Sequence, residues 1–289
     1  MDARTRELFE VNIDDILAAF GWENAPVLRP LVRRVARRPA LAFAREMTGF
    51  DERAAAAGAQ AASRELLSSF TRGVTVTGAE RIPPRGPVLL LSNHPGMTDT
   101  LALFSAIPRD DLRVLAAERP FLRALPAVVQ RLIFIPEDGS KRLGAVRRAI
   151  DHLRAGGALL TFPAGEIEPD PAVLTGATAG LDRWSESTSV FLRLAPECTV
   201  VPVIVSGVLA PQAQRHPLTR LRRRRVDRER LGAMLQVLAH TLRPEAWRVR
   251  VRVDFPAAFT ARELSGRGPA SRAPLMQTVA ETLRLRERA

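Results

Sequence analysis

Residues 89–100, LLLSNHPGMTDT, contain a histidine and a carboxylate that could act together in catalysis. His94 follows directly on an apolar run, and Asp99 stands five positions later. Imidazole exchanges protons near neutral pH, and a carboxylate bonded to one ring nitrogen leaves the other nitrogen free to act as a base. The pair therefore has the residue types of a general base and its orienting acid.

A structural interpretation competes for Asp99, because Asp or Thr before an apolar segment commonly caps a helix. On one continuous helix, His94 and Asp99 would point about 140° apart. Pro95 and Gly96 interrupt the chain between them. We therefore expect a turn that lets the carboxylate fold back towards the ring, as a base and its partner require.

Apolar and β-branched runs alternate with helical segments in the rest of the chain. The predicted strands are residues 74–78, 88–93, 113–118, 132–136, 158–163, 199–207 and 249–255. The predicted helices among them are residues 99–107, 119–132, 141–156, 185–197, 227–242 and 274–287. Several of these strands are apolar throughout, whereas the last alternates and indicates an edge or one-sided strand. The pattern predicts a three-layer α/β domain with a largely parallel or mixed central sheet of about seven strands flanked by helices.

An N-terminal helical segment, residues 1–70, is expected to precede the α/β domain of residues 71–289. Prolines 26, 30 and 39 divide its first part into short helices, and the alanine-rich residues 52–70 predict one more helix. Arginines alternate with apolar residues between positions 28 and 38. This pattern fits an interfacial membrane anchor and fits a helical cap packed on the sheet equally well.

The net charge of +12 is carried almost wholly by arginine. A basic protein attracts nucleic acid, anionic membrane, acidic carrier proteins or phosphorylated substrates. Cys198 is the single cysteine, which excludes an intramolecular disulfide and favours a reducing compartment. We find neither a run of about 18 apolar residues nor the apolar region of a signal peptide, so we expect a cytoplasmic protein.

Three further motifs follow the histidine motif NHPGMTD. They are LIFIPEDGSKR at residues 132–142, LLTFPAGEIEPD at residues 159–170 and VVPVIVSG at residues 200–207. In order and separation, the four resemble the motifs of the glycerophospholipid acyltransferase superfamily, which includes lysophosphatidic acid and glycerol-3-phosphate acyltransferases. The resemblance extends over residues 75–210, and the FPAGE sequence looks like that of a variant branch.

The resemblance implies transfer of a fatty acyl group from acyl-coenzyme A or acyl carrier protein to a hydroxyl of a lysolipid or glycerol-like acceptor. It implies that His94 is the general base, that Asp99 orients it, and that neither a metal nor a further cofactor takes part. Backbone amides around Gly96 or Gly165 are the expected donors to the oxyanion. The residues implied to bind substrates are Asn93, Gly96, Phe134, Lys141, Arg142, Phe162, Pro163, Gly165, Glu166 and Pro202.

The chain departs from the family pattern where the family binds an acceptor phosphate. Ala164 replaces the usual glutamate, Ile167 replaces an arginine, and Pro136 stands where another arginine is expected. Either Lys141 or Arg142 takes over this role, or the acceptor has no exposed phosphate monoester.

Other polar residues have simpler interpretations. Glu166, Glu168 and Asp170 could hold a cation, but acids in a proline-containing loop are expected to be solvated. We assign core or surface roles to Trp184 and to the three remaining histidines.

Two rival functions remain. One is a non-catalytic basic protein that binds membrane or nucleic acid through its arginine-rich segments, and the other is a thioesterase in which water replaces the alcohol. No nucleic-acid-binding motif is present, so nucleic acid is not an expected partner. For the acyltransferase, we expect peripheral contact with the anionic inner face of the membrane.

Overall fold

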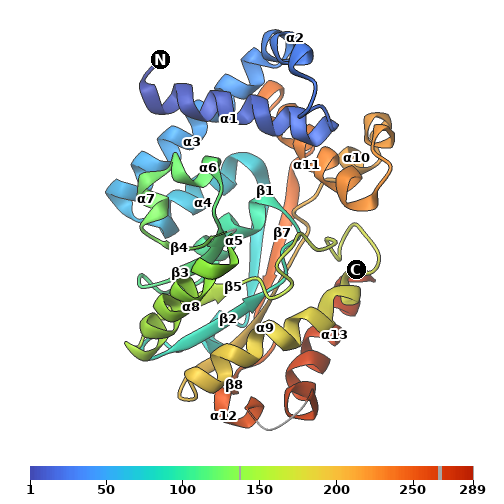
Figure 1. Cartoon of the computed structure of the whole chain (residues 1–289). Coiled ribbons are helices and arrows are strands. Elements are labelled where there is room, and N and C mark those ends of the chain that lie inside the picture. Colours follow the sequence, from blue (N-terminus) through green and yellow to red (C-terminus); the bar gives the residue numbers. More distant parts are fainter. Residues whose placement is uncertain (137, 266–268, 289) are drawn as a thin grey trace. The chain divides into compact units, whose positions relative to one another are not determined.

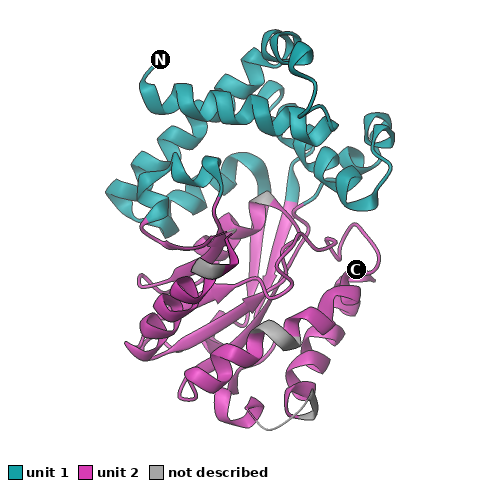
Figure 2. Ribbon diagram, in the orientation of Figure 1, with its two compact units in different colours: residues 1–72, 119–129, 209–249 teal, residues 73–118, 130–208, 250–289 magenta. Residues whose placement is uncertain are grey.

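The computed structural model describes residues 1–136, 138–265 and 269–288. Within these ranges the described part leaves out the side chains of Met97, Ser140, Lys141, Ser185, Glu186, Ser187, Pro269 and Ala270. The chain forms two compact units (Figure 2). Unit 1 comprises residues 1–72, 119–129 and 209–249, and unit 2 comprises residues 73–118, 130–208 and 250–289.

A mixed sheet is the centre of unit 2. Its strands are β1 (Thr71–Thr77), β2 (Val88–Ser92), β3 (Arg113–Ala117), β4 (Leu132–Ile135), β5 (Ala158–Thr161), β6 (Thr199–Ser206), β7 (Val249–Asp254) and β8 (Phe259–Thr260). The strand order is β1-β7-β6-β2-β5-β3-β4, with β8 paired to β6. Strands β2, β3, β4, β5 and β6 run parallel, whereas β7 and β8 are antiparallel to β6. The predicted mixed α/β sheet is confirmed, and β7 is one-sided rather than an edge strand.

Helices that bury one apolar face cover this sheet. They are α5 (Met97–Ala106), α8 (Gly139–Arg154), α9 (Leu181–Leu194), α12 (Ala261–Leu264) and α13 (Ala273–Glu287), with short 3-10 turns η2 (Ala79–Arg81), η3 (Ala177–Gly180) and η5 (Pro269–Arg272). Figure 1 shows α8, α9 and α13 side by side on one face. Leu153, Trp184 and Val279 of these helices share a buried core with Leu89 and Leu159 of β2 and β5. Strands that are buried on both faces consist of continuous apolar runs, and this is why they could be predicted from the sequence.

Unit 1 is helical. Its elements are α1 (Ala3–Phe20), η1 (Pro26–Leu28), α2 (Arg29–Val35), α3 (Arg37–Ala57), α4 (Ala59–Phe70), α6 (Pro120–Arg123), α7 (Pro126–Val129), α10 (Pro211–Gln214), η4 (Pro217–Leu221) and α11 (Arg225–Leu242). As predicted, prolines 26, 30 and 39 divide this segment, and each stands in the first turn of a separate helix. The pieces are not all short, because α3 is 21 residues long. The single helix predicted over residues 52–70 is wrong, because Gly58 adopts φ +86° and separates α3 from α4.

The unit boundaries differ from the predicted division at residue 70. Unit 1 also contains residues 119–129 and 209–249, so both units are discontinuous in sequence. Asp51 of α3 shows one reason, since its carboxylate accepts hydrogen bonds from the amides of Ala127 and Val128 at 2.9 and 3.0 Å. This carboxylate caps α7. The sequence of residues 119–129 contains no local pattern that predicts a contact with Asp51, which lies more than 70 positions earlier.

None of the helices in the described ranges combines the length and the apolarity that a membrane crossing requires.

Candidate active site

The histidine motif and the FPAGE motif lie at neighbouring strand ends. β2 pairs in parallel with β5 on one side and with β6 on the other. The carboxyl ends of parallel strands meet at one edge of a sheet, and ligands of α/β proteins bind at that edge. Residues 93–99 follow β2 there, and residues 162–170 follow β5.

His94 and Asp99 form a hydrogen-bonded pair. The ring Nδ1 of His94 lies 2.7 Å from Oδ2 of Asp99, whose side chain is fully buried at 0% exposure, while 29% of the histidine side chain is exposed. The same Oδ2 accepts the amide N–H of Gly96 at 3.0 Å, and Thr100 donates to Oδ1 at 3.0 Å. Gly96, with φ +149°, forms the turn that brings the carboxylate back to the ring. Asp99 is therefore both the cap of α5 and the partner of His94.

The environment of His94 favours a base that is held in one orientation. With a carboxylate on Nδ1, the neutral ring carries its proton there and presents Nε2 as the acceptor. The ring also stacks on Phe162 of the FPAGE loop, with the centroids 4.5 Å apart. Burial disfavours the charged ring, but the charge and hydrogen bond of Asp99, with the charge of Glu168, outweigh it and raise the pKa of His94.

Asn93 connects the histidine loop to β6. Its side-chain amide donates to the carbonyl of Val205 at 2.8 Å and accepts the Val205 amide at 2.8 Å. The side chain thus continues the ladder between β2 and β6 where the strands separate. Only 1% of Asn93 is exposed. Both of its amide groups are used within the fold, so the Asn93 side chain holds the loop after β2 against β6.

Two acids that the sequence assigned to solvent are buried. Glu168 is 2% exposed and Asp170 is 0% exposed. Glu168 binds the backbone of His94 and the indole of Trp184. Asp170 accepts the amides of Gly207 and Val208, which follow β6, at 2.8 and 2.7 Å. The prediction of a solvated acidic loop is wrong for both residues, because backbone N–H donors from other loops meet them at the sheet edge.

The FPAGE loop exposes Gly165 and Glu166 at its tip. Gly165 is exposed with φ +69°, and its amide donates to the carbonyl of Phe162 at 3.0 Å. Glu166 is exposed and forms an ion pair with Arg183 at 2.8 Å, while Pro163 and Ala164 are buried. The amides of Gly96 and Gly165 both donate to internal acceptors, so neither serves as an oxyanion donor without a local rearrangement.

The remaining residues of the predicted site lie elsewhere. Phe134 is in β4 at the far edge of the sheet, and Arg142 is exposed in α8 and bonds the carbonyl of Pro136 at 3.5 Å. The side chain of Lys141 lies outside the described residues. Pro202 is buried within β6, between the residues that pair with β8 and those that pair with β7. A proline has no N–H to donate, so this gap in the ladder suits it.

A pocket of about 340 Å³ lies away from this chemistry, at the opposite ends of the strands. Arg109 stands in its wall and donates to the carbonyls of Pro83, Gly86 and Gly156 at 2.9 to 3.0 Å and to the carboxylate of Asp111. The guanidinium thus joins the turns that enter β2, β3 and β5. Its donors are engaged, so the pocket is a structural feature.

Among the described residues, no group of three or more His, Cys, Asp and Glu side chains is placed to hold a metal ion.

Comparisons with known proteins agree with the motifs. The model of the acyltransferase family matches residues 73–206, the segment that carries His94 and Asp99. No curated protein matches the chain. The crystal structure of the 1-acyl-sn-glycerophosphate (LPA) acyltransferase PlsC from Thermotoga maritima is similar with a TM-score of 0.48 and 15% identity, over 98% of this chain and 95% of that one. That likeness is too distant to say what this chain acts on. The family model matches a little under half of the chain, and this match supports an acyltransferase activity located in residues 73–206.

Proposed function

We propose that the chain moves a fatty acyl group from acyl-coenzyme A or acyl carrier protein to a hydroxyl of a lysophospholipid or a related polar lipid. The observation that carries this proposal is the 2.7 Å contact between Nδ1 of His94 and the buried carboxylate of Asp99. It leaves Nε2 of a partly exposed ring as the proton acceptor, at a strand end inside the matched domain.

The reaction needs one proton transfer in each direction. Nε2 of His94 takes the proton of the acceptor hydroxyl as its oxygen attacks the thioester carbonyl, and Asp99 stabilises the imidazolium. The tetrahedral oxyanion then collapses, the carbon–sulfur bond breaks, and the imidazolium returns the proton to the leaving thiolate. No acyl-enzyme forms. Phe162 of the FPAGE loop stacks on the His94 ring, so the exposed ion pair between Glu166 of that loop and Arg183 is the first place to look for acceptor contacts.

A transfer assay tests this proposal. Purified protein is incubated with labelled long-chain acyl-coenzyme A or acyl carrier protein and a panel of lysolipids, and the products are identified by mass spectrometry. We expect acylated lipid from the unaltered protein and a loss of at least about 100-fold in His94→Ala, because a general base contributes at least that much. His216→Ala, which removes a histidine that caps η4 in unit 1, is the matched control and should retain activity.

The products also separate the rival functions. Free fatty acid in place of acylated lipid would identify a thioesterase. Equal activity in a folded His94→Ala protein would refute the proposed base.

Peripheral membrane contact is the second part of the proposal, and unit 1 has a surface that suits it. Val27, Leu31 and Val35 are 82%, 58% and 74% exposed, at a spacing that places them along one side of η1 and α2. Arg34 and Arg38 are exposed beside them. Apolar side chains that enter the lipid boundary and arginines that meet anionic head groups are the properties of an interfacial helix. We call Val27, Leu31, Val35, Arg34 and Arg38 the α2 surface.

A further inference from the structure

Glu168 holds both polar groups of the His94 backbone. Its own amide donates to the carbonyl of His94 at 2.9 Å, and its carboxylate Oε2 accepts the amide of His94 at 3.1 Å. The two residues are 74 positions apart in the chain, in the loops after β2 and β5. One residue thus fixes the peptide from which the catalytic imidazole projects.

The other oxygen of this carboxylate is also engaged. Trp184 of α9, with 0% exposure, donates from its indole Nε1 to Oε1 of Glu168 at 3.0 Å. A Cβ on Gly180 would lie 3.1 Å from the same oxygen, which shows how closely the backbone of η3 approaches it. The carboxylate therefore sits in a closed, buried site that was not predicted, because the sequence placed Glu168 in a solvated loop.

We propose that Glu168 is a positioning residue of this acyltransferase, whose ionised carboxylate holds the His94 loop in its active conformation. This inference rests on the proposed role of His94. The amide N–H of His94 and the indole N–H of Trp184 point at the two carboxylate oxygens. Both donors are therefore hydrogen-bonded only if both oxygens of residue 168 are acceptors. A protonated acid or an amide accepts at one oxygen and opposes a donor with a donor at the other, which costs a buried hydrogen bond.

The charge of this residue changes close to neutral pH. Burial raises the pKa of Glu168 to about 7, although its bonds from Trp184 and His94 and the charges of His94 and Arg183 favour the ionised form. The titratable and charged groups around it are the His94 ring with Asp99 behind it, Arg183 of α9, and Glu166, which is paired to Arg183. Glu168 is therefore fully ionised, and accepts both hydrogen bonds, only well above pH 7, and it is progressively protonated as the pH falls through about 7.

The test compares the unaltered enzyme with Glu168→Gln in the transfer assay. At pH 8, we expect the variant to lose about 10- to 100-fold in kcat, the value of a hydrogen bond to a buried charge, with little change in KM. Below pH 7 the ratio of kcat in the unaltered enzyme to kcat in Glu168→Gln should fall towards one, because Glu168 is then neutral in the unaltered enzyme as well. Glu229→Gln removes a buried carboxylate of unit 1 and serves as the matched control, with full activity.

Nuclear magnetic resonance on the unaltered protein gives a second measurement that needs no active variant. The backbone amide of His94 and the indole N–H of Trp184 should titrate together with one midpoint near neutrality, because one carboxylate accepts both. Trp184→Phe assigns the indole signal among the three tryptophans.

Two results would overturn this inference. The first is an unchanged kcat in Glu168→Gln. The second is a loss of kcat in Glu168→Gln that does not vary with pH, together with different titration midpoints for the His94 amide and the Trp184 indole N–H. Failure of the proposed function would look different, since His94→Ala would then be active.

Discussion

Asp99 performs two tasks with one carboxylate oxygen. Oδ2 accepts from the amide of Gly96, which begins α5, and it contacts Nδ1 of His94. A helix cap needs an acceptor at the start of the helix, and an orienting acid needs an acceptor beside the ring. The Pro95–Gly96 turn brings these two requirements to the same point. Helix capping and catalysis, which compete as explanations of Asp99 in the sequence, are therefore compatible.

The pH dependence of transfer follows from this pair. The charge and hydrogen bond of Asp99 raise the pKa of His94 against the effect of burial, and the base must be neutral to accept a proton. We therefore expect kcat/KM to rise with pH through a midpoint above the ordinary histidine pKa of 6.5. Asp99→Asn should move this midpoint to lower pH, because burial then acts without the opposing charge.

The same substitution should lower the rate at every pH. An amide at position 99 no longer selects the tautomer with the proton on Nδ1, and we expect a loss of about 10² to 10⁴ in kcat. Steady-state rates between pH 5 and 9 measure both effects. An unchanged midpoint in Asp99→Asn would show that another group sets the pKa.

At the scale of the elements, side chains tie strand ends to one another. Asn93 joins β2 to β6, Glu168 joins the loops after β2 and β5, and Asp170 joins the FPAGE loop to the end of β6. Each contact uses backbone N–H or C=O groups that no longer have partners in the sheet ladder. These side chains thereby tie the loops around His94 to neighbouring strand ends.

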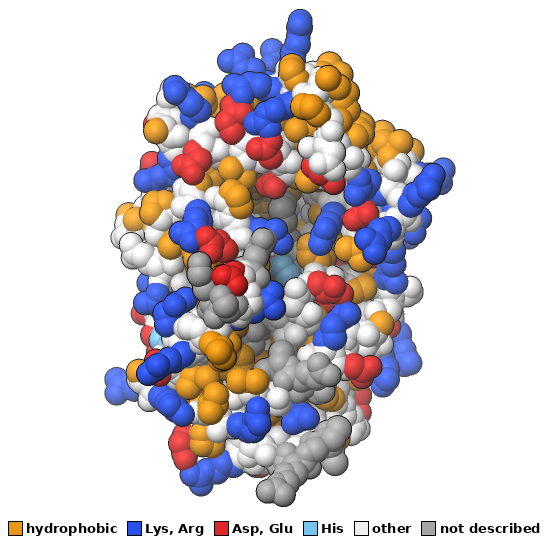
Figure 3. All heavy atoms as spheres, viewed as in Figure 1, with side chains coloured by type: hydrophobic (Ala, Val, Ile, Leu, Met, Phe, Trp, Pro, Cys, Tyr) orange, Lys and Arg blue, Asp and Glu red, His pale blue; other side chains and the backbone are white. Residues whose placement is uncertain are grey.

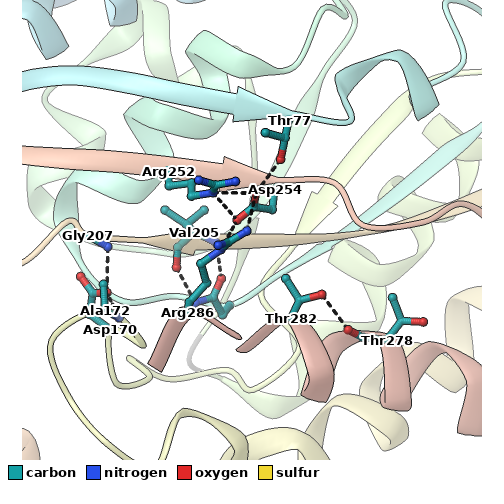
Figure 4. A network of polar contacts seen from close by, with 11 residues as sticks. Thr77, Asp170, Ala172, Val205, Gly207, Arg252, Asp254, Thr278, Thr282 and Arg286 are labelled. Carbon is teal, nitrogen blue, oxygen red and sulfur yellow. Dashed lines mark hydrogen bonds and ion pairs between the residues drawn. The ribbon is translucent and has the colours of Figure 1, made fainter. Parts of the chain in front are cut away.

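A second set of polar contacts joins β1, β7 and α13 (Figure 4). Asp254 of β7 is 3% exposed and accepts from Thr77 of β1 at 2.5 Å and from Arg286 of α13 at 2.7 Å. Arg252 donates to it from the same strand at 2.9 Å. Burial opposes ionisation, but these bonds and the charge of Arg286 outweigh it and lower the pKa of Asp254.

This network predicts a pH-dependent contribution to stability. A carboxylate whose pKa is lowered by folding stabilises the protein above its unfolded-state pKa, and that stabilisation is lost as the pH falls through the folded-state pKa. Asp254→Asn should reduce the free energy of unfolding by about 1–3 kcal/mol at pH 7, because charged hydrogen bonds are lost. The difference should narrow below the ordinary carboxyl pKa of 3.8.

Denaturant unfolding of both proteins between pH 7 and 3 measures this difference. Asp151→Asn, at an exposed position of α8, is the control and should stay within about 0.5 kcal/mol of the unaltered protein. If the difference in free energy of unfolding between the unaltered protein and Asp254→Asn does not change with pH, the effect is due to packing and not to charge.

At the scale of the whole molecule, the net charge of +12 says little about partners by itself. On the face drawn in Figure 3, Arg side chains are spread among Asp and Glu side chains and do not form one continuous patch. Within unit 1, Arg29 and Arg33 of α2 form ion pairs with Glu10 of α1. The location of exposed apolar residues beside arginines is therefore more informative than the total charge.

Binding to vesicles tests the α2 surface. We expect the protein to sediment with anionic vesicles and much less with zwitterionic ones, and added salt should weaken binding. The combined change Val27→Ser, Leu31→Ser and Val35→Ser should lower the partition coefficient at least about 10-fold, because each apolar side chain gains roughly 1 kcal/mol or more on insertion.

Leu285→Ser, at an exposed leucine of α13, is the control for this experiment and should bind like the unaltered protein. If the triple variant binds vesicles normally but changes the oligomeric state in solution, the α2 surface contacts a second copy of the chain instead.

The sequence by itself determined the strands, the helices around them and the positions of His94 and Asp99. These are local properties: runs of apolar residues mark buried strands, and a proline–glycine pair marks a turn. Only the tertiary structure decided that Glu168 and Asp170 are buried, that Asn93 pairs with β6, and that residues 119–129 belong with the N-terminal helices. These facts depend on partners far away in the sequence, since whether a polar group is solvated is set by which donors the fold brings to it.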